Sequence, residues 1–259
     1  MDTAAIYELL DKKHRFMVTS HITPDGDSIG STLALTLALL KMGKRAVPVI
    51  KDDIPKKYSF LPGTDLIVKD TSESFDAVIA LDCGDIERLG FEKQLKEYGP
   101  IVINIDHHKS NDFFGDLNLV DANSSSVGEM VYRLIDGKID IDYDIALNLY
   151  TAIITDTGSI KYSNTTPSSL KILANLVDKG VKPDYVSRHV FERRSLASIK
   201  LLKSVLNTLE ISADGKIASL LITRDMLRDS GASEEDTDGM INYAREIEGV
   251  EVAVIFKEN

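Results

Sequence analysis

The sequence is poor in cysteine and tryptophan and has no long apolar run. Its 259 residues include one cysteine, Cys83, and no tryptophan. A single cysteine excludes an internal disulfide framework and is typical of a reducing compartment, so we expect a cytoplasmic location. No apolar stretch approaches the about 20 residues that a membrane-spanning helix needs. We therefore predict no association with a membrane.

Basic residues are scarce relative to acidic ones. The chain has 30 lysines and arginines against 41 aspartates and glutamates, and its formal net charge is -11. A surface of that sign does not attract a polyanion over long range, which argues against a long nucleic acid as partner. An acidic surface accounts for most of the excess, and part of it can belong to a site for divalent cations.

Short apolar runs alternate with helical patterns over the first two-thirds of the chain. The predicted strands are nearly continuous in apolar residues, as buried parallel strands are; they are 15–20, 45–50, 75–82, 100–106 and 117–121. The predicted helices, marked by stops such as Gly43 and caps such as Thr166 followed by Pro167, are 26–43, 124–137, 142–158 and 165–180. This alternation is typical of an α/β fold, an open parallel sheet with helices on both faces.

From about residue 187 the pattern changes. We predict a helical connector over 193–210 and a strand pair around the turn at 214–215. A helix over 233–249 and a strand over 250–259 follow. These elements form an α+β unit of about 50 residues, which is small for an independent fold.

Four short segments rich in aspartate and histidine lie where a predicted strand or helix ends. Loops beyond the carboxyl ends of parallel strands meet at one crevice, so these segments are expected to converge. They are His21, Asp25 and Asp27 in "HITPDGD", Asp82 and Asp85 in "ALDCGD", Asp106, His107 and His108 in "NIDHHKSN", and Asp156 in "ITDTGS".

Each segment alone has an ordinary structural explanation. An Asp-x-Asp pair after a strand can cap a helix, and "DCGD" can simply form a turn. Adjacent histidines at a strand end have little packing rationale, and Asp156 at a helix C-terminus opposes the helix dipole. The four segments together favour a metal centre.

The types of ligand indicate which metals fit. Carboxylates and imidazoles without a thiolate suit Mn²⁺, with Mg²⁺, Co²⁺ or Zn²⁺ as alternatives. The many carboxylates exceed what one ion needs, whereas two ions about 4 Å apart that share a carboxylate account for them and suit displacement at phosphorus. Beside this centre, His108 can donate to a phosphate oxygen, and Cys83 is expected to be a small buried hydrophobe. Arg88, Lys109 and Lys161 can contact phosphate or equally be solvated surface.

The segments "SHITPDGDSIGS", "ALDCGD", "IDHHKSN" and "ITDTGSIKYSNTTP" resemble the four motifs of the DHH phosphoesterase superfamily. The segments "KYSFLPG" and "EGVEVAVIF" are most similar to its nano-RNase branch. The resemblance implies a DHH domain over 1–186, a helical linker over 187–208 and part of a smaller DHHA1 substrate-binding domain over 209–259. The "GGGH" segment that normally ends the DHHA1 domain is not in this sequence, so we expect the C-terminal end of that domain to be missing.

The resemblance also implies roles for individual residues. Two divalent ions, most suitably Mn²⁺, would be held by His21, Asp25 and Asp82 and by Asp27, Asp82, His107 and Asp156, with Asp82 as the bridge. The catalytic set would be Asp82, His108 and Asp106, with His108 on the scissile phosphate and with Asp106 and Asp85 orienting the histidines. The residues expected to contact substrate are His108, Arg88, Lys161, Ser163 and Thr165.

The activity that the resemblance implies is a Mn²⁺-dependent phosphodiesterase of exonuclease type. It would release 5'-mononucleotides from short oligonucleotides and remove the 3'-phosphate from 3'-phosphoadenosine 5'-phosphate (pAp). Cyclic-dinucleotide hydrolysis, a family II-type pyrophosphatase and a non-catalytic binding module remain alternatives. The expected partners are a short oligonucleotide or small nucleotide, and a second copy through the DHH domain.

Overall fold

The computed structural model describes residues 3–258 and divides into two compact units. The units are Met1–Phe191 and Glu192–Asn259. The domain boundaries implied by the resemblance stay a prediction. Among residues 3–258, no helix combines the length and the apolar character needed to cross a bilayer.

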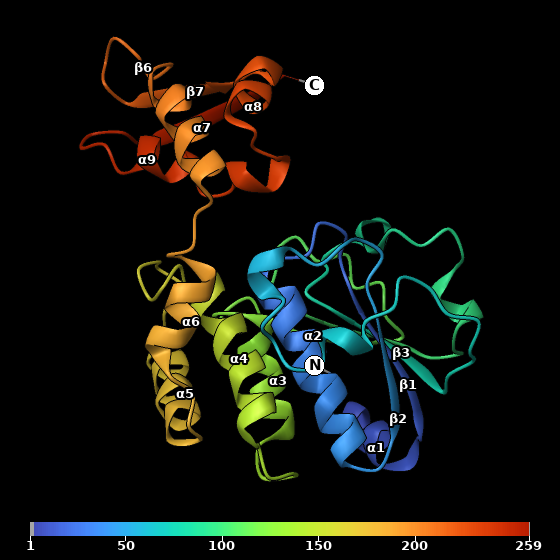
Figure 1. Ribbon diagram of the computed structural model, residues 1–259. Coiled ribbons are helices and arrows are strands. Elements are labelled where there is room, and N and C mark those ends of the chain that lie inside the picture. Colours follow the sequence, from blue (N-terminus) through green and yellow to red (C-terminus); the bar gives the residue numbers. More distant parts are fainter. Residues whose placement is uncertain (1–2, 259) are drawn as a thin grey trace. The chain divides into compact units, whose positions relative to one another are not determined.

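The first unit is built on a five-stranded parallel sheet in the order β2-β1-β3-β4-β5 (Figure 1). Pro48 lies in β2, an edge strand, where a missing backbone N–H is tolerated. From β1 the chain passes to β2 on one side and then to β3 on the other, so the topology reverses between β1 and β3. The strands are β1 (Arg15–Ser20), β2 (Arg45–Val49), β3 (Ala77–Leu81), β4 (Val102–Asp106) and β5 (Leu117–Val120).

Successive side chains of each strand point to opposite faces of the sheet and pack in two separate cores. Phe16 and Val18 of β1 join a large core with the α-helices, whereas Met17 joins a smaller core on the opposite face. The 3₁₀ helices η3 (Ile86–Leu89) and η4 (Leu95–Glu97) contribute to that second core. The elements on the first face are α1 (Thr3–Lys12), α2 (Gly26–Lys41), α3 (Val127–Ile135), α4 (Tyr143–Asp156), α5 (Pro167–Asp178), α6 (Pro183–Val190) and η1 (Lys56–Tyr58), and η2 (Thr64–Leu66) follows η1. The predicted α/β class is confirmed.

The predicted helix signals have clear structural counterparts. Thr166 caps α5 by accepting from the Ser169 N–H, and Pro167 is the first helical residue. Gly43 follows α2 with a left-handed φ of 74°, the conformation that commonly ends a helix. These local predictions are confirmed because they depend only on neighbouring residues.

The second unit contains a three-stranded sheet in the order β6-β7-β8, covered by short helices. The single helix predicted over 233–249 is wrong. The chain forms η5 (Glu234–Thr237), turns at Gly239 with a φ of 73°, and then forms α9 (Ile241–Arg245). Helix α8 was not predicted. The remaining elements are α7 (Leu196–Leu206), β6 (Glu210–Ile211), β7 (Ile217–Ile222), α8 (Arg224–Ser230) and β8 (Val252–Lys257).

Candidate metal centre

The histidines and aspartates that follow β1, β3, β4 and α4 converge in the first unit. They form three overlapping groups in which each residue offers a ligand atom within 4.8 Å of the others. All six residues predicted as metal ligands are thereby brought together, and His108 joins them. The groups are His21 with Asp25 and Asp82, Asp27 with His107 and Asp156, and Asp82 with His107 and His108.

Backbone carbonyls orient both imidazoles that would bind metal. His21 Nδ1 lies 2.7 Å from the Ile22 carbonyl oxygen, and His107 Nδ1 lies 3.2 Å from that of Ser124. A carbonyl oxygen only accepts, so each Nδ1 carries a proton and the neutral ring has a lone pair on Nε2. The Nε2 atoms of His21 and His107 face Asp82 at 3.5 and 3.8 Å. Both rings therefore present a ligand nitrogen to the carboxylates.

The carboxylates of the cluster lie close together, and those of Asp27 and Asp82 are buried, whereas Asp25 is exposed. Burial, followed by the charges of Asp82 and Asp156, raises the pKa of Asp27 well above its usual value. Burial likewise raises the pKa of Asp156 to about 6, and the nearby Asp82 charge adds to the rise. Asp82 Oδ1 is buried and has no hydrogen-bond partner among the described residues. A divalent cation fits this donor set, because it would offset the repulsion and occupy the unpaired oxygen.

Asp82 has an unusual backbone conformation directly after β3. Its φ is 55°, in the left-handed region, and its N–H donates to the Ile105 carbonyl at 3.0 Å. Asparagine and aspartate tolerate this region better than most residues do. Asp85, expected to orient a histidine, instead caps η3 by accepting from the Glu87 N–H at 2.8 Å.

His108 is held by a buried carboxylate. Its Nδ1 lies 2.7 Å from Asp106 Oδ1, and the hydrogen bond that it donates to Asp106 raises the pKa of His108 to about 9. Asp106 is fully buried and also accepts from Asn111 Nδ2 at 2.6 Å. The His108 side chain is 40% exposed, so His108 can meet a ligand while Asp106 acts through it. Asn111 was not predicted as a site residue, although it is the last residue of the third motif.

The residues predicted to contact substrate differ from one another in exposure and in hydrogen bonding. Arg88, Lys161 and Ser163 are exposed and lie outside the three candidate ligand groups. The Thr165 hydroxyl is buried and has no hydrogen-bond partner among the described residues. Asn164, which stands between Ser163 and Thr165 in the sequence, was not predicted as a site residue. Its Nδ2 lies 3.2 Å from Asp156 Oδ2. The signal in the sequence was the place of Asn164 inside the fourth motif, between two residues with hydroxyl side chains.

Cys83 is fully buried beside this centre and packs in the smaller core. Burial raises the pKa of its thiol to about 12. We expect Cys83→Ala to retain activity and to cost about 1 kcal/mol of stability, the loss of a small buried group. In the native protein, iodoacetamide should label Cys83 far more slowly than in urea, as mass spectrometry would measure. Rapid native labelling, or an inactive alanine variant, would contradict a purely structural thiol.

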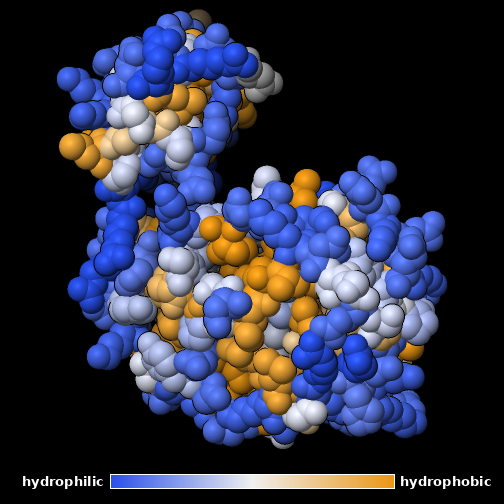
Figure 2. Space-filling view, turned by 45° about the vertical axis from the view of Figure 1, so that its right-hand side comes forward, coloured by the Kyte–Doolittle hydropathy of each residue, from blue (hydrophilic) through white to orange (hydrophobic). Residues whose placement is uncertain are grey.

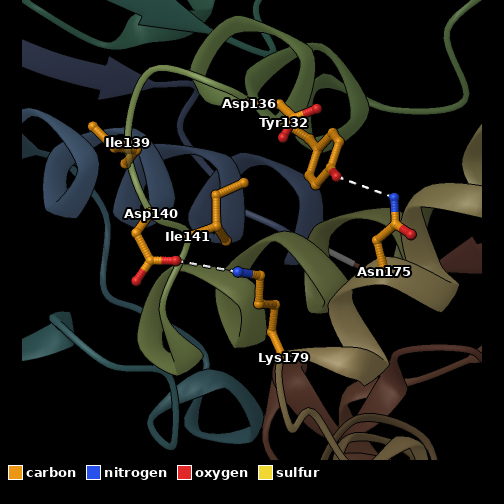
Figure 3. Close-up of a pocket in the computed structure, with 7 residues that line it drawn as sticks. All are labelled: Tyr132, Asp136, Ile139, Asp140, Ile141, Asn175 and Lys179. Atoms are coloured by element: carbon orange, nitrogen blue, oxygen red, sulfur yellow. Dashed lines mark hydrogen bonds and ion pairs between the residues drawn. The ribbon is translucent and has the colours of Figure 1, made fainter.

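A separate small pocket lies between α3 and α5 (Figure 3). Lys179 is paired with Asp140 at 3.2 Å, and Asn175 Nδ2 donates to the Tyr132 hydroxyl at 3.2 Å. These polar groups already pair with one another. The pocket is therefore a much poorer site for a cation than the crowded carboxylates are.

Comparison with known proteins agrees with this site. The model of the DHH family, N-terminal domain, matches residues 15–153. The chain belongs to the DHH family. It is a DHH-family phosphoesterase with a buried cluster of histidines and aspartates consistent with divalent metal binding.

Similar proteins cover most of the chain. The bifunctional oligoribonuclease and PAP phosphatase NrnA of Thermus thermophilus is 35% identical over 253 residues, which are 93% of this chain and 72% of that protein. The protein of the same name from Bacillus subtilis is 26% identical, over 92% of this chain and 76% of its own length.

Solved structures show the same fold. An exopolyphosphatase-related protein from Bacteroides fragilis superposes with a TM-score of 0.93 at 24% identity, over 99% of this chain and 79% of that chain. A putative family II inorganic pyrophosphatase from Methanococcus jannaschii superposes with a TM-score of 0.57 at 20% identity, over 93% of this chain and 84% of that chain. At these identities the likeness concerns the fold alone.

Proposed function

We propose that this DHH-family protein is a two-metal phosphodiesterase that hydrolyses short oligonucleotides to 5'-mononucleotides and also dephosphorylates pAp. The observation that carries the proposal is the pair of ligand groups, His21 with Asp25 and Asp27 with His107 and Asp156, on either side of Asp82. The substrate class is supported by the similar proteins named oligoribonuclease and PAP phosphatase.

Each ion would have its own ligands and share one. His21, Asp25 and Asp82 would hold the first, and Asp27, Asp82, His107 and Asp156 the second. When bound, the ions supply Lewis-acid activation of water and neutralise charge on the phosphate. Mn²⁺ suits the oxygen and imidazole donors best, with Mg²⁺ and Co²⁺ as alternatives.

The protein's own groups position the phosphate. His108 donates Nδ1–H to Asp106, which leaves Nε2 to bind a phosphate oxygen. Asp106 is buried and therefore has a positioning role through His108. Further phosphate and hydroxyl contacts would come from the remaining predicted residues, which are Arg88, Lys161, Ser163 and Thr165.

The test is product chromatography with a substrate panel in Mn²⁺. We expect a 5'-phosphorylated dinucleotide to give mononucleotides and pAp to lose its 3'-phosphate, with chelator abolishing both reactions. Faster turnover of a cyclic dinucleotide or of pyrophosphate would replace the proposed substrate class. Hydrolysis that persists in chelator would contradict the metal-dependent mechanism.

Three further proposals concern the organisation of the protein. The second unit would contain the DHHA1-like domain over 209–259, after a linker over 187–208. A homodimer through the first unit stays a prediction. Apolar side chains gather on one face of that unit (Figure 2). Leu40, Leu66 and Val68 are among the exposed apolar residues of the unit. Light scattering would measure the oligomeric state. The cytoplasmic location also stays a prediction.

A further inference from the structure

One short turn contacts two residues of the cluster directly and is joined to a third through an amide side chain. His107 Nδ1 bonds the carbonyl of Ser124 at 3.2 Å. The N–H groups of Val127 and Gly128 donate to the two oxygens of Asp27 at 2.7 and 2.8 Å. The turn 124–128, whose last two residues begin α3, thus contacts two of the three residues in the group Asp27, His107 and Asp156 directly.

The third residue of that group reaches the same turn through an amide. Asn164 Nδ2 donates to the Ser125 carbonyl at 2.9 Å and to Asp156 Oδ2 at 3.2 Å. By contrast, His21 of the other group is held by the Ile22 carbonyl, and Asp25 accepts from the Ser28 N–H. The two groups are therefore supported by different parts of the backbone.

A buried glutamate holds the turn in place. Glu129 is 1% exposed, and its Oε2 accepts from both the N–H and the hydroxyl of Ser125, at 2.9 and 2.7 Å. Its Oε1 lies 3.1 Å from Arg133 Nη2, which also donates to the Ser124 hydroxyl at 2.5 Å. That hydroxyl donates in turn to Asp121 at 2.8 Å. A buried carboxylate with these partners is costly to disturb, so it defines the conformation of the turn.

We propose that Glu129 is a positioning residue for one of the two metal ions. Through the turn 124–128 it holds Asp27, His107 and Asp156 in a binding arrangement, and it touches neither metal nor substrate. The inference rests on the proposed two-metal function. It assigns the two ions unequal dependence on Glu129, which a purely structural residue would not produce.

The experiment is calorimetric titration of the metal-stripped full chain with Mn²⁺ alone. We expect the wild-type protein to bind two ions. Glu129→Ala should keep one site unchanged and weaken the other about 10- to 100-fold, as loss of a group that orients ligands does. Glu129→Gln retains an acceptor for Ser125 and should recover most of the lost affinity.

Two more variants distinguish a specific loss of Mn²⁺ affinity from a general loss of stability. Asp142→Ala removes the cap of α4 and should lower the melting temperature while leaving both Mn²⁺ affinities unchanged. If Glu129→Ala does not fold, Ser125→Ala replaces it in the test. This variant removes only the hydroxyl that donates a hydrogen bond to Glu129. It should weaken the same single site several-fold.

The outcomes separate the two ideas. The proposed role of Glu129 is wrong if Glu129→Ala binds two Mn²⁺ ions with wild-type affinities, or if the affinities of both sites fall equally. Either result leaves the two-metal function standing. A wild-type protein that binds fewer than two ions would overturn the two-metal function and this inference with it.

Discussion

Asp82→Asn should reduce oligonucleotide hydrolysis by about 10³-fold, which corresponds to about 4 kcal/mol of lost transition-state stabilisation. Asp82 stands in two of the three ligand groups and faces both His21 and His107. Asparagine keeps the size of the side chain and tolerates the left-handed φ of 55° at this position. The substitution removes the negative charge and replaces one ligand oxygen by an amide NH2 group. Steady-state kinetics in Mn²⁺ would measure the loss of activity.

The same variant should respond differently to metal in a thermal melt. The Asp82 charge repels Asp27 and Asp156 in the metal-free protein, so Asp82→Asn should melt no lower than wild type in chelator. Saturating Mn²⁺ should raise the stability of wild type by about 4 kcal/mol at about 1,000 times its dissociation constant, and that of the variant by much less.

Asp85→Asn is the matched control for Asp82→Asn. Both residues belong to the "DCGD" segment, but Asp85 caps η3 and lies outside the ligand groups. The control should keep wild-type activity. If Asp82→Asn also keeps full hydrolysis, or if the two variants lose activity equally, the shared-ligand role of Asp82 is wrong.

Gly30→Ala should lower stability by about 2 kcal/mol and weaken Mn²⁺ binding as well. A Cβ at Gly30 would lie 2.5 Å from the carbonyl oxygen of Asn148 in α4. Separating α2 from α4 would cost about 3 kcal/mol, and the better helix propensity of alanine returns about 1 kcal/mol. Asp27 lies in the first turn of α2 and Asp156 ends α4, so the shift would also misplace two proposed ligands.

The measurement for Gly30→Ala is a melting temperature with and without Mn²⁺, and we expect a fall of about 4–8 °C. Gly43→Ala at the other end of α2 is the control. It has a φ of 74° but no heavy atom within 4 Å of the added Cβ. It should lose only about 1 kcal/mol from left-handed strain and keep its Mn²⁺ affinity. Equal effects of the two substitutions would contradict the helix-contact explanation.

Much of the first unit could be predicted because its signals are local. The apolar runs of β1, β3 and β4, the Thr166 cap and the Gly43 stop depend on neighbours in the chain. The helix predicted over 233–249 failed because Gly239 adopts a left-handed φ of 73° and separates η5 from α9. A segment of helix-forming residues does not by itself show at which glycine the chain will leave the helical conformation.

The chain itself specified which chemical groups could meet. Aspartates and histidines follow the strand ends, and parallel strands bring their carboxyl ends to one edge. Most of the aspartates and histidines in these segments lie within ligand distance of one another, whereas Asp85 and Asp106 are in none of the ligand groups. Whether they bind two ions, and on which substrate they act, stays a prediction for the experiments above.

Only the folded molecule shows how those groups are held. Asp27 accepts from Val127, 100 residues further along the chain, and Asn164 joins Asp156 to Ser125. The buried Glu129 that supports this turn reads in the sequence as an ordinary helix residue. Such contacts join residues far apart in the chain through specific packing, and residue type and spacing carry no record of the distances that packing produces.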